Sequence, residues 1–461
     1  MMVRRVLARA RIRAAAVLVP GLLASLLMPL SSAQADGSDS LSMESYMRPV
    51  NAEPLDLAEL QQQPSKLRGL PNEEATQAVL PRETLGQAKT YAPLATEYSA
   101  RYQPPSRRPL TSRAPAAISL PEPPHTMTTQ ECVAGLATKT FCIKSRYAVC
   151  SGKQFDQVWL RNGSPVGTSH FDVLAIGTIP QNSRTITVTC YFTDFTTAKE
   201  NGAAWMGIRT KGSVTHSWPS TAAYTQGGVT MPFTRTWSQL LGADTYQHTL
   251  TVAAGQGSDT PKTDLIAAPP AWASEPITGG DLFMLPPRWD MAPYLPNAAA
   301  GAASWAVLTQ LQYSTAAGAP EREVALHIQK AFATPGMTQP PMARKDLPGK
   351  GPDPALTRLY WDTKRRDLTR NRSVYNCGKC FGEDYATSAG YARECDEYPM
   401  ASTYEGAGHS DDDPLAEPGN FSVLPVKKED NGAGGILLAQ FYDKNRVIDG
   451  PDDAFWIEIT S

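Results

Sequence analysis

The residues best suited to chemistry in this chain are two neighbouring acids, Asp396 and Glu397, which lie between Cys395 and Pro399. Their carboxylates offer hard oxygen ligands, which suit Mg²⁺ or Mn²⁺ better than a soft metal. A divalent ion held in this way neutralises phosphate charge and activates a water molecule. The doublet therefore predicts a divalent-metal site of the kind that phosphodiester hydrolysis requires. A solvated acidic turn is the alternative interpretation.

The backbone decides whether both acids can serve one ion. On a regular strand, neighbouring side chains point to opposite faces, so Asp396 and Glu397 would separate. They can share an ion if the chain bends, or if one binds the ion and the other holds a water or a supporting group. Because Pro399 follows closely, we expect an irregular backbone here.

Two downstream residues extend the predicted site. Glu405 precedes a glycine, which permits close approach of backbone or substrate. Asn431 lies in segment 430–435, which is predicted to be a glycine-rich loop, and offers a neutral amide oxygen. Carboxylates with an amide oxygen suit a hard ion that keeps several waters, so the predicted metal ligands are Asp396, Glu397 and Asn431.

Basic residues crowd the segment before the doublet, where the pattern predicts a helix over 356–375. Arg366 and Arg370 are four residues apart and share a helix face, which Arg365 and Arg372 flank. Such a face can hold a phosphate backbone without reading bases, and a solvated helix face is the alternative. The basic residues of this segment are Arg358, Lys364, Arg365, Arg366, Arg370 and Arg372.

A longer signature surrounds these residues. It reads Cys395-Asp396-Glu397-Tyr398-Pro399, then Tyr404-Glu405-Gly406, with Arg372-Ser373 and Cys377 before it and Asp430-Asn431 after it. Over about residues 321–461, the chain resembles the NucA/NucB-type secreted bacterial deoxyribonucleases. The resemblance implies an Mg²⁺- or Mn²⁺-dependent, sequence-nonspecific DNA endonuclease of mixed α/β fold.

The resemblance also implies roles for single residues. Asp396 and Glu397 match the acidic pair of the active site, Asn431 matches a downstream polar residue, and Glu405 matches a further acidic position. The family has no histidine general base, and no histidine adjoins the doublet here. The chain departs from the family pattern at Cys380, in an insertion at 410–420, and in a lysine-rich loop at 345–350.

A mechanism follows as an expectation. Asp396, helped by Glu397 or Asn431, would hold the ion, and Glu397 or Glu405 would accept a proton from water. Basic side chains would hold the adjacent phosphates and stabilise the developing charge. These are Arg372 as a catalytic residue and Arg365, Arg366 and Arg370 as DNA-binding residues.

The seven cysteines fall into a group of four and a group of three. The group of four can form two disulfides, in any of three connectivities. In the group of three, we expect Cys395 to bond Cys377, with Cys380 as the alternative partner. A zinc site using these cysteines and His409 is the less favoured interpretation. The four are Cys132, Cys142, Cys150 and Cys190, and the three are Cys377, Cys380 and Cys395.

The N-terminal third predicts export and disorder. Residues 1–35 combine arginines, an apolar run and an Ala-x-Ala site, as in a secretory signal peptide, which predicts a secreted, extracellular protein without stable membrane association. Residues 36–128 are rich in proline and polar residues, which predicts a disordered segment. The formal net charge of −2 provides no global field for nucleic acid, so attraction must be local.

The remaining chain predicts two domains, and hence a multidomain protein. Residues 129–317 predict a β-rich, sandwich-like domain, with strands at 155–160, 185–192, 246–252 and 305–313 and a tight turn at Asn162-Gly163. Residues 318–461 predict a small mixed α/β nuclease domain that begins with a helix over 321–332, in which His327 serves helix packing.

Other functions remain open for the β-rich domain. Its many tryptophans could form a carbohydrate or cell-wall binding surface, although ordinary core packing is the favoured interpretation. The main alternative is an exported envelope or carbohydrate-binding protein with an inactive nuclease-like domain. A nuclease toxin with an inhibitor or immunity protein as its partner is a third alternative.

Overall fold

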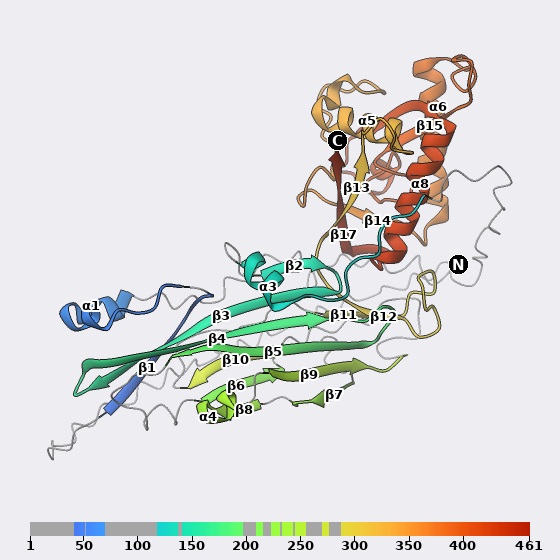
Figure 1. Cartoon of the computed structure of the whole chain (residues 1–461). Coiled ribbons are helices and arrows are strands. Elements are labelled where there is room, and N and C mark those ends of the chain that lie inside the picture. Colours follow the sequence, from blue (N-terminus) through green and yellow to red (C-terminus); the bar gives the residue numbers. More distant parts are fainter. Residues whose placement is uncertain are drawn as a thin grey trace, which may run out of the picture. The chain divides into compact units, whose positions relative to one another are not determined.

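The computed structural model describes residues 41–50, 52–69, 118–136, 141–196, 209–214, 223–230, 233–242, 245–254, 270–275 and 287–461. The predicted signal peptide, 1–35, lies outside these ranges. Leu41–Ser461 form one compact unit, and Figure 1 labels most of its helices and strands. Within the described ranges, no helix is long and apolar enough to cross a membrane.

The largest sheet confirms that the central region is rich in β-structure. Its strands pair in the order β1-β3-β4-β5-β9-β7, with β2 beside β3, and every pairing is antiparallel. In β5, the predicted alternation is observed, since Ile186, Val188 and Cys190 are buried. The strands are β1 (Leu41–Pro49), β2 (Phe141–Ser145), β3 (Ala148–Arg161), β4 (Ser164–Thr178), β5 (Thr185–Thr196), β7 (Tyr224–Gly228) and β9 (Thr245–Val252).

The tight turn between β3 and β4 is also confirmed. Asn162 and Gly163 have φ values of 51° and 80°, both in the left-handed region that a two-residue hairpin turn of type I′ requires. Asparagine and glycine adopt this region at low cost. The turn therefore fixes the pairing of Arg161 with Ser164, and a bulge between Trp159 and Leu160 shifts the register of the rest of this strand pair.

Smaller elements complete the central region. A second sheet has the order β10-β6-β8, and β11 pairs with β12. These strands are β6 (Arg209–Val214), β8 (Phe233–Thr236), β10 (Pro270–Glu275), β11 (Pro287–Asp290) and β12 (Ala302–Trp305), and the helices are α3 (Thr129–Leu136) and α4 (Trp237–Leu241).

The prediction of disorder over 36–128 is wrong for its first part. Strand β1 pairs with β3 from Leu41 opposite Arg161 to Pro49 opposite Lys153, and Met47 is buried. Helix α1 (Leu57–Gln62) and a 3₁₀ turn, η1 (Pro64–Gly69), follow. The hydrogen bonds of β1 come from a strand about a hundred residues away, a contribution that local composition does not reveal. Residues 70–117 lie outside the described ranges.

The C-terminal region is built around a three-stranded sheet. Its order is β13-β17-β14, and β13 runs parallel to β17. The predicted domain boundary at residue 318 therefore falls after the first strand of this sheet, which has Leu311 and Tyr313 buried beside Ile457. The strands of this sheet are β13 (Thr309–Ser314), β14 (Leu356–Arg358) and β17 (Gly450–Thr460). Strands β15 (Arg393–Tyr398) and β16 (Ser422–Lys427) pair as a separate two-stranded sheet.

Helices pack around these strands. Helix α5 (Arg322–Ala333) confirms the predicted helix, with Val324 and Ile328 in the core. The helix predicted over 356–375 is corrected: its first residues form β14, and α6 (Thr363–Phe381) begins after Asp362, whose side chain accepts a hydrogen bond from the backbone N of Arg365 at 2.9 Å. The other helices are η3 (Pro335–Met337), α7 (His409–Asp412) and α8 (Lys428–Lys444).

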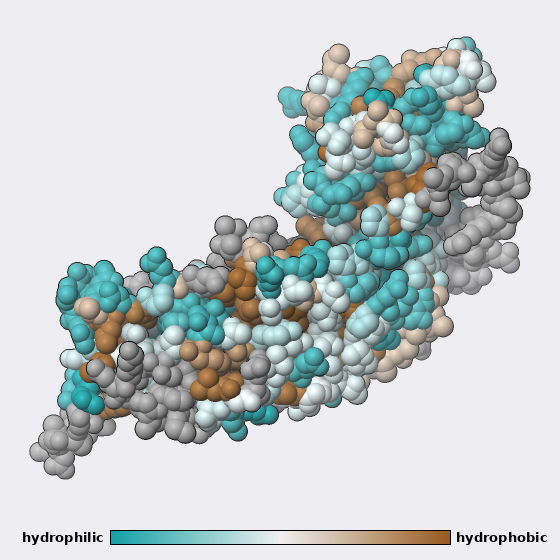
Figure 2. Space-filling model, in the orientation of Figure 1, coloured by the Kyte–Doolittle hydropathy of each residue, from teal (hydrophilic) through white to brown (hydrophobic). Residues whose placement is uncertain are grey.

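Two large hydrophobic clusters hold the described chain together. One lies on the central sheet and includes Phe155, Phe171 and Trp289, and the other joins α5, α8 and the C-terminal strands. Buried ion pairs link Arg146 and Arg288 to Asp453. On the face seen in Figure 2, hydrophilic residues predominate and hydrophobic residues form separate patches.

Candidate functional site

The acidic doublet lies on a strand whose two faces are covered by different helices. Strand β15 pairs with β16 without a register shift, with Asp396 opposite Leu424 and Glu397 opposite Val423. The expected backbone bend is therefore absent within the doublet, and the two side chains point to opposite faces. Asp396 faces α5, and Glu397 faces α6 together with Cys395.

Asp396 is held by a histidine. Its Oδ2 lies 2.6 Å from Nδ1 of His327, and Nε2 of His327 lies 2.7 Å from Oγ of Ser422. His327 and Ser422 are buried, and Asp396 is 7% exposed. Tyr398 lies opposite Ser422 in the strand pair, so Asp396 and Ser422 share the face that α5 covers.

Glu397 has a different environment. Burial, and then the negative charge of Asp396, raise the pKa of its carboxyl to about 7, while the positive charge of Arg370 opposes this rise. The backbone N of Ala401 donates a weak hydrogen bond to Oε1 of Glu397 at 3.4 Å. A carboxyl with this environment can accept a proton near neutral pH.

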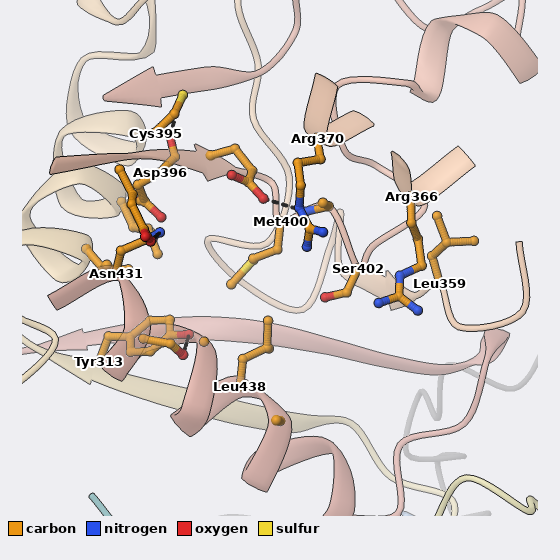
Figure 3. Close-up of a pocket in the computed structure, with 18 of the residues that line it drawn as sticks. Tyr313, Leu359, Arg366, Arg370, Cys395, Asp396, Met400, Ser402, Asn431 and Leu438 are labelled. Carbon is orange, nitrogen blue, oxygen red and sulfur yellow. Dashed lines mark hydrogen bonds between the residues drawn. The ribbon is translucent and has the colours of Figure 1, made fainter. Parts of the chain in front are cut away.

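A cavity of about 680 Å³ runs beside β15. Five consecutive residues, 393–397, line it, as expected at a strand edge that pairs with no other described strand. Figure 3 draws Asp396 and Asn431 on one side and Arg366 and Arg370 on the other. Strand β15 and helix α8 thus place carboxylate and amide oxygens at the cavity, and α6 places positive charge there.

The four predicted basic residues divide into two pairs. Arg366 and Arg370 line the cavity, as a shared helix face predicts. Arg365 instead donates to the carbonyl O of Tyr404 at 2.7 Å and pairs with Asp412. The predictions for Arg365 and Arg372 therefore need correction, because both guanidinium groups are turned to other partners.

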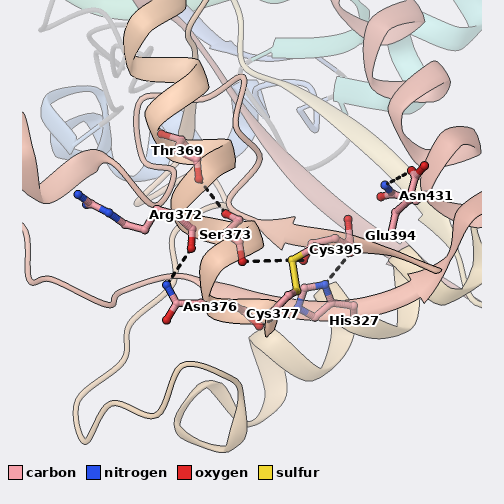
Figure 4. Close-up of a disulfide and its surroundings, with 11 residues drawn as sticks. His327, Thr369, Arg372, Ser373, Asn376, Cys377, Glu394, Cys395 and Asn431 are labelled. Atoms are coloured by element: carbon pink, nitrogen blue, oxygen red, sulfur yellow. Dashed lines mark hydrogen bonds and ion pairs between the residues drawn. A yellow bond between two sulfur atoms is a disulfide. The ribbon is translucent and has the colours of Figure 1, made fainter. Parts of the chain in front are cut away.

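The contacts of Arg372 explain its place outside the cavity. Its Nη1 donates to the carbonyl O of Ala407 at 2.8 Å, and its Nη2 bonds Asp411 at 2.8 Å. Figure 4 shows the side chain directed away from the disulfide beside β15. Asp411 belongs to the insertion at 410–420, so the extra acidic residues bind the flanking arginines.

Glu405 is also separated from the cavity. Its two carboxylate oxygens accept hydrogen bonds from Thr357, at 2.9 Å from the backbone N and 2.6 Å from Oγ1. Burial raises the pKa of this carboxyl to about 7, although the hydrogen bonds from Thr357 lower it. Glu405 anchors the segment after β15 to β14, and its predicted catalytic role is not supported by its position.

Asn431 lies in the first turn of α8 and not in a loop, and it lines the cavity. Its Nδ2 donates to Oε2 of Glu394 at 3.0 Å, which leaves the amide oxygen available for another contact. Glu394 and Asp396 are two residues apart on β15 and share a face. The strand and the helix therefore place a carboxylate and an amide on one side of the cavity.

The disulfide between Cys377 and Cys395 joins α6 to β15, as expected. Figure 4 draws this disulfide. Cys395 is buried, and it directly precedes Asp396 in the sequence. Cys380 is not bonded to it, and the zinc interpretation fails because two of its ligands are consumed. Of the two disulfides expected in the group of four, Cys132–Cys150 is formed, while Cys190 remains a buried thiol.

The donor set fits a hard divalent ion. Within the described ranges, no three His, Cys, Asp or Glu side chains converge on a metal site. Mg²⁺, however, commonly uses one or two protein ligands and completes its shell with water and phosphate oxygens. Oδ1 of Asp396, which takes no hydrogen bond from the described residues, and the amide oxygen of Asn431 are atoms of this ligand type, and both residues line the cavity.

The tryptophans of the central region serve packing where they are described. Trp159, Trp289 and Trp305 are buried. Trp159 donates to Ser169 and Trp289 to the carbonyl O of Arg184. These three residues form no binding surface.

Sequence reasoning missed the contact between His327 and Asp396. One signal was present, since His327 lies three residues after Val324 and four before Ala331, on the buried face of α5. The partner strand was not evident, because Asp396 and Ser422 are 69 and 95 residues away.

Comparison with known proteins identifies no relative: no protein-family model, no curated protein and no solved structure matches the chain.

Proposed function

We propose that this protein is a divalent-metal-dependent, sequence-nonspecific DNA endonuclease whose active site is the cavity beside β15. One observation carries the proposal: the carboxylates of β15 and the guanidinium groups of Arg366 and Arg370 line the same cavity. An acidic ion site opposite arginines suits a phosphodiester, which needs its charge neutralised on more than one side. The resemblance over 321–461 supports the same function, and the signal peptide predicted over 1–35 supports export.

Different residues of the cavity have separate roles in the proposed reaction. Asp396 and Asn431 would hold Mg²⁺ or Mn²⁺, and the bound ion would polarise a phosphate oxygen and lower the pKa of a water molecule. Glu397, on the other face of β15, accepts a proton from the attacking water. Arg366 and Arg370 bind the phosphates on either side of the scissile bond. None of these residues reads a base edge, so cleavage is independent of sequence.

The test is digestion of supercoiled plasmid by the full chain, with Mg²⁺, with Mn²⁺, and with EDTA. We expect nicked and then linear plasmid with either metal and no cleavage with EDTA. Single-stranded DNA and RNA in parallel reactions define the substrate class. A protein that leaves plasmid intact at every metal concentration would refute the proposal.

A variant pair assigns the activity to the cavity. Asp396→Ala removes the proposed ion ligand and should lower the cleavage rate at least ~100-fold, an effect typical of lost electrostatic stabilisation. Asp411→Ala removes an aspartate that pairs with Arg372 outside the cavity, and should retain activity. Near-normal cleavage by a folded Asp396→Ala protein would contradict the assignment.

A further inference from the structure

We infer that His327 is a positioning residue for Asp396, held in turn by Ser422, and that this pair sets the affinity of the site for its ion. This inference rests on the proposed function and deepens it, because it identifies what orients the ion ligand. Its basis is a continuous line of hydrogen bonds from Ser422 through His327 to Asp396, with distances of 2.7 and 2.6 Å.

The direction of each hydrogen bond follows from the acceptor. A carboxylate only accepts, so Nδ1 of His327 donates to Oδ2 of Asp396. In the neutral ring, Nε2 is then the acceptor and the hydroxyl of Ser422 donates to it. The carboxylate of Asp396 thereby fixes the tautomer, and the contact with Ser422 holds the tilt of the ring.

Burial makes this arrangement rigid. His327 is 1% exposed and Ser422 is 0% exposed, so neither side chain can exchange its partner for bulk water. Neither residue lines the cavity, whereas Asp396 does. The pair therefore acts on the site only through Asp396, and it has no direct contact with substrate.

The same geometry excludes another function for these residues. A serine, a histidine and an aspartate linked in this order have the connectivity of a hydrolase triad. Ser422, however, is fully buried on β16 and lies outside the cavity, so its hydroxyl cannot reach a substrate. The carboxylate is the end of the chain of hydrogen bonds that meets the cavity.

One consequence concerns the two oxygens of Asp396. The hydrogen bond from His327 occupies Oδ2 and fixes the torsion of the carboxylate. Oδ1 is then the oxygen available to an ion. A hydrogen bond donated to a ligating carboxylate favours its ionised form and restricts its orientation, and loss of such a supporting partner typically lowers metal affinity or activity 10- to 100-fold.

Two substitutions separate positioning from packing. In His327→Asn, the amide nitrogen lies near the place of Nδ1 and keeps the donor to Asp396. In His327→Gln, the amide reaches the place of Nε2, keeps the contact with Ser422 and loses the donor to Asp396. Each variant removes one buried hydrogen bond, so similar losses of stability are expected.

The measurements are Mn²⁺ affinity by electron paramagnetic resonance without DNA, the plasmid cleavage rate, and the melting temperature of the full chain. We expect His327→Asn to retain most of the Mn²⁺ affinity, and His327→Gln to lose about 10- to 100-fold in affinity and in cleavage rate. His409→Gln, at a half-buried histidine that pairs with Asp413 and does not line the cavity, serves as the control and should match the wild type.

The outcomes are distinguishable. Equal Mn²⁺ affinity in His327→Asn and His327→Gln proteins of equal stability would overturn the positioning role. Wild-type protein that binds Mn²⁺ but leaves DNA intact would refute the nuclease proposal. The role of His327 would still be decided by whether the His327→Asn protein binds Mn²⁺ more tightly than the His327→Gln protein. Wild-type protein that binds no Mn²⁺ would overturn both.

Discussion

Asp396 and Glu397 are adjacent in the chain but lie on opposite faces of β15, where Asp396 meets His327 of α5 and Glu397 meets the positive charge of Arg370 on α6. A regular strand requires this separation. The doublet is therefore not a chelating pair, and its two carboxylates have different environments. On this basis we assign ion binding to Asp396 and proton transfer to Glu397.

The first prediction concerns Glu397. Glu397→Gln should keep the shape of the side chain and remove the proton acceptor, lowering kcat by about 10²- to 10⁴-fold. Mn²⁺ affinity should remain close to that of the wild type, because Asp396 and Asn431 are unchanged. Single-turnover cleavage and electron paramagnetic resonance measure the two effects. A variant with weak Mn²⁺ binding and an unchanged cleavage step would reverse the assignment of the two acids.

The second prediction separates the cavity arginines from the flanking ones. Arg366→Ala and Arg370→Ala should each weaken DNA binding and reduce the slope of log affinity against log salt by about one. Arg372→Ala should leave the slope unchanged, because its guanidinium is bonded to Ala407 and Asp411. Fluorescence anisotropy of a labelled duplex at several salt concentrations measures all three. Equal slopes in all three variants would contradict the proposed phosphate contacts.

The third prediction uses two disulfides as a matched pair. Cys132–Cys150 and Cys377–Cys395 each span 18 residues, so removal of either by double substitution to serine should cost a similar free energy of unfolding, about 3 kcal/mol. Only loss of Cys377–Cys395 should also lower activity, since Cys395 adjoins Asp396. Urea denaturation and plasmid cleavage report the two quantities. An equal loss of activity in both variants would indicate a general effect of stability.

The fourth prediction concerns pH and Glu405. Because burial raises the pKa of Glu405 to about 7 in the folded protein, the folded state binds more protons than the unfolded state between the ordinary pKa of 4.5 and 7. Its contribution to stability therefore falls as the pH rises through this range. Glu405→Gln should remove this loss, because the amide can still bond Thr357.

Urea denaturation at pH 4.5 and at pH 7.5 tests this effect. The free energy of unfolding of Glu405→Gln, measured relative to the wild type, should be higher at pH 7.5 than at pH 4.5. Glu417→Gln, at an exposed position, is the control: its free energy of unfolding relative to the wild type should be the same at both pH values. A relative stability of Glu405→Gln that does not change with pH would show that Glu405 does not titrate in this range.

Local patterns predicted several elements correctly. The alternation in 185–192, the Asn162-Gly163 turn and the apolar period of 321–332 each depend on neighbours within a few residues, and each is observed. The spacing of Arg366 and Arg370 likewise predicts their shared face, because helix geometry fixes it. The composition of 36–128 predicted disorder where β1 forms. The hydrogen-bond partners of β1 lie on β3, and the local sequence does not reveal them.

The sequence by itself determined which residues could do chemistry and, through the two-residue period of a strand, that Asp396 and Glu397 would diverge on regular backbone. Only the tertiary structure decided which groups these side chains would contact. His327 reaches Asp396 across 69 residues, Thr357 binds Glu405, and Asp411 binds Arg372. These partners depend on which helix covers which face of β15, and long-range packing, which no local period encodes, sets that arrangement.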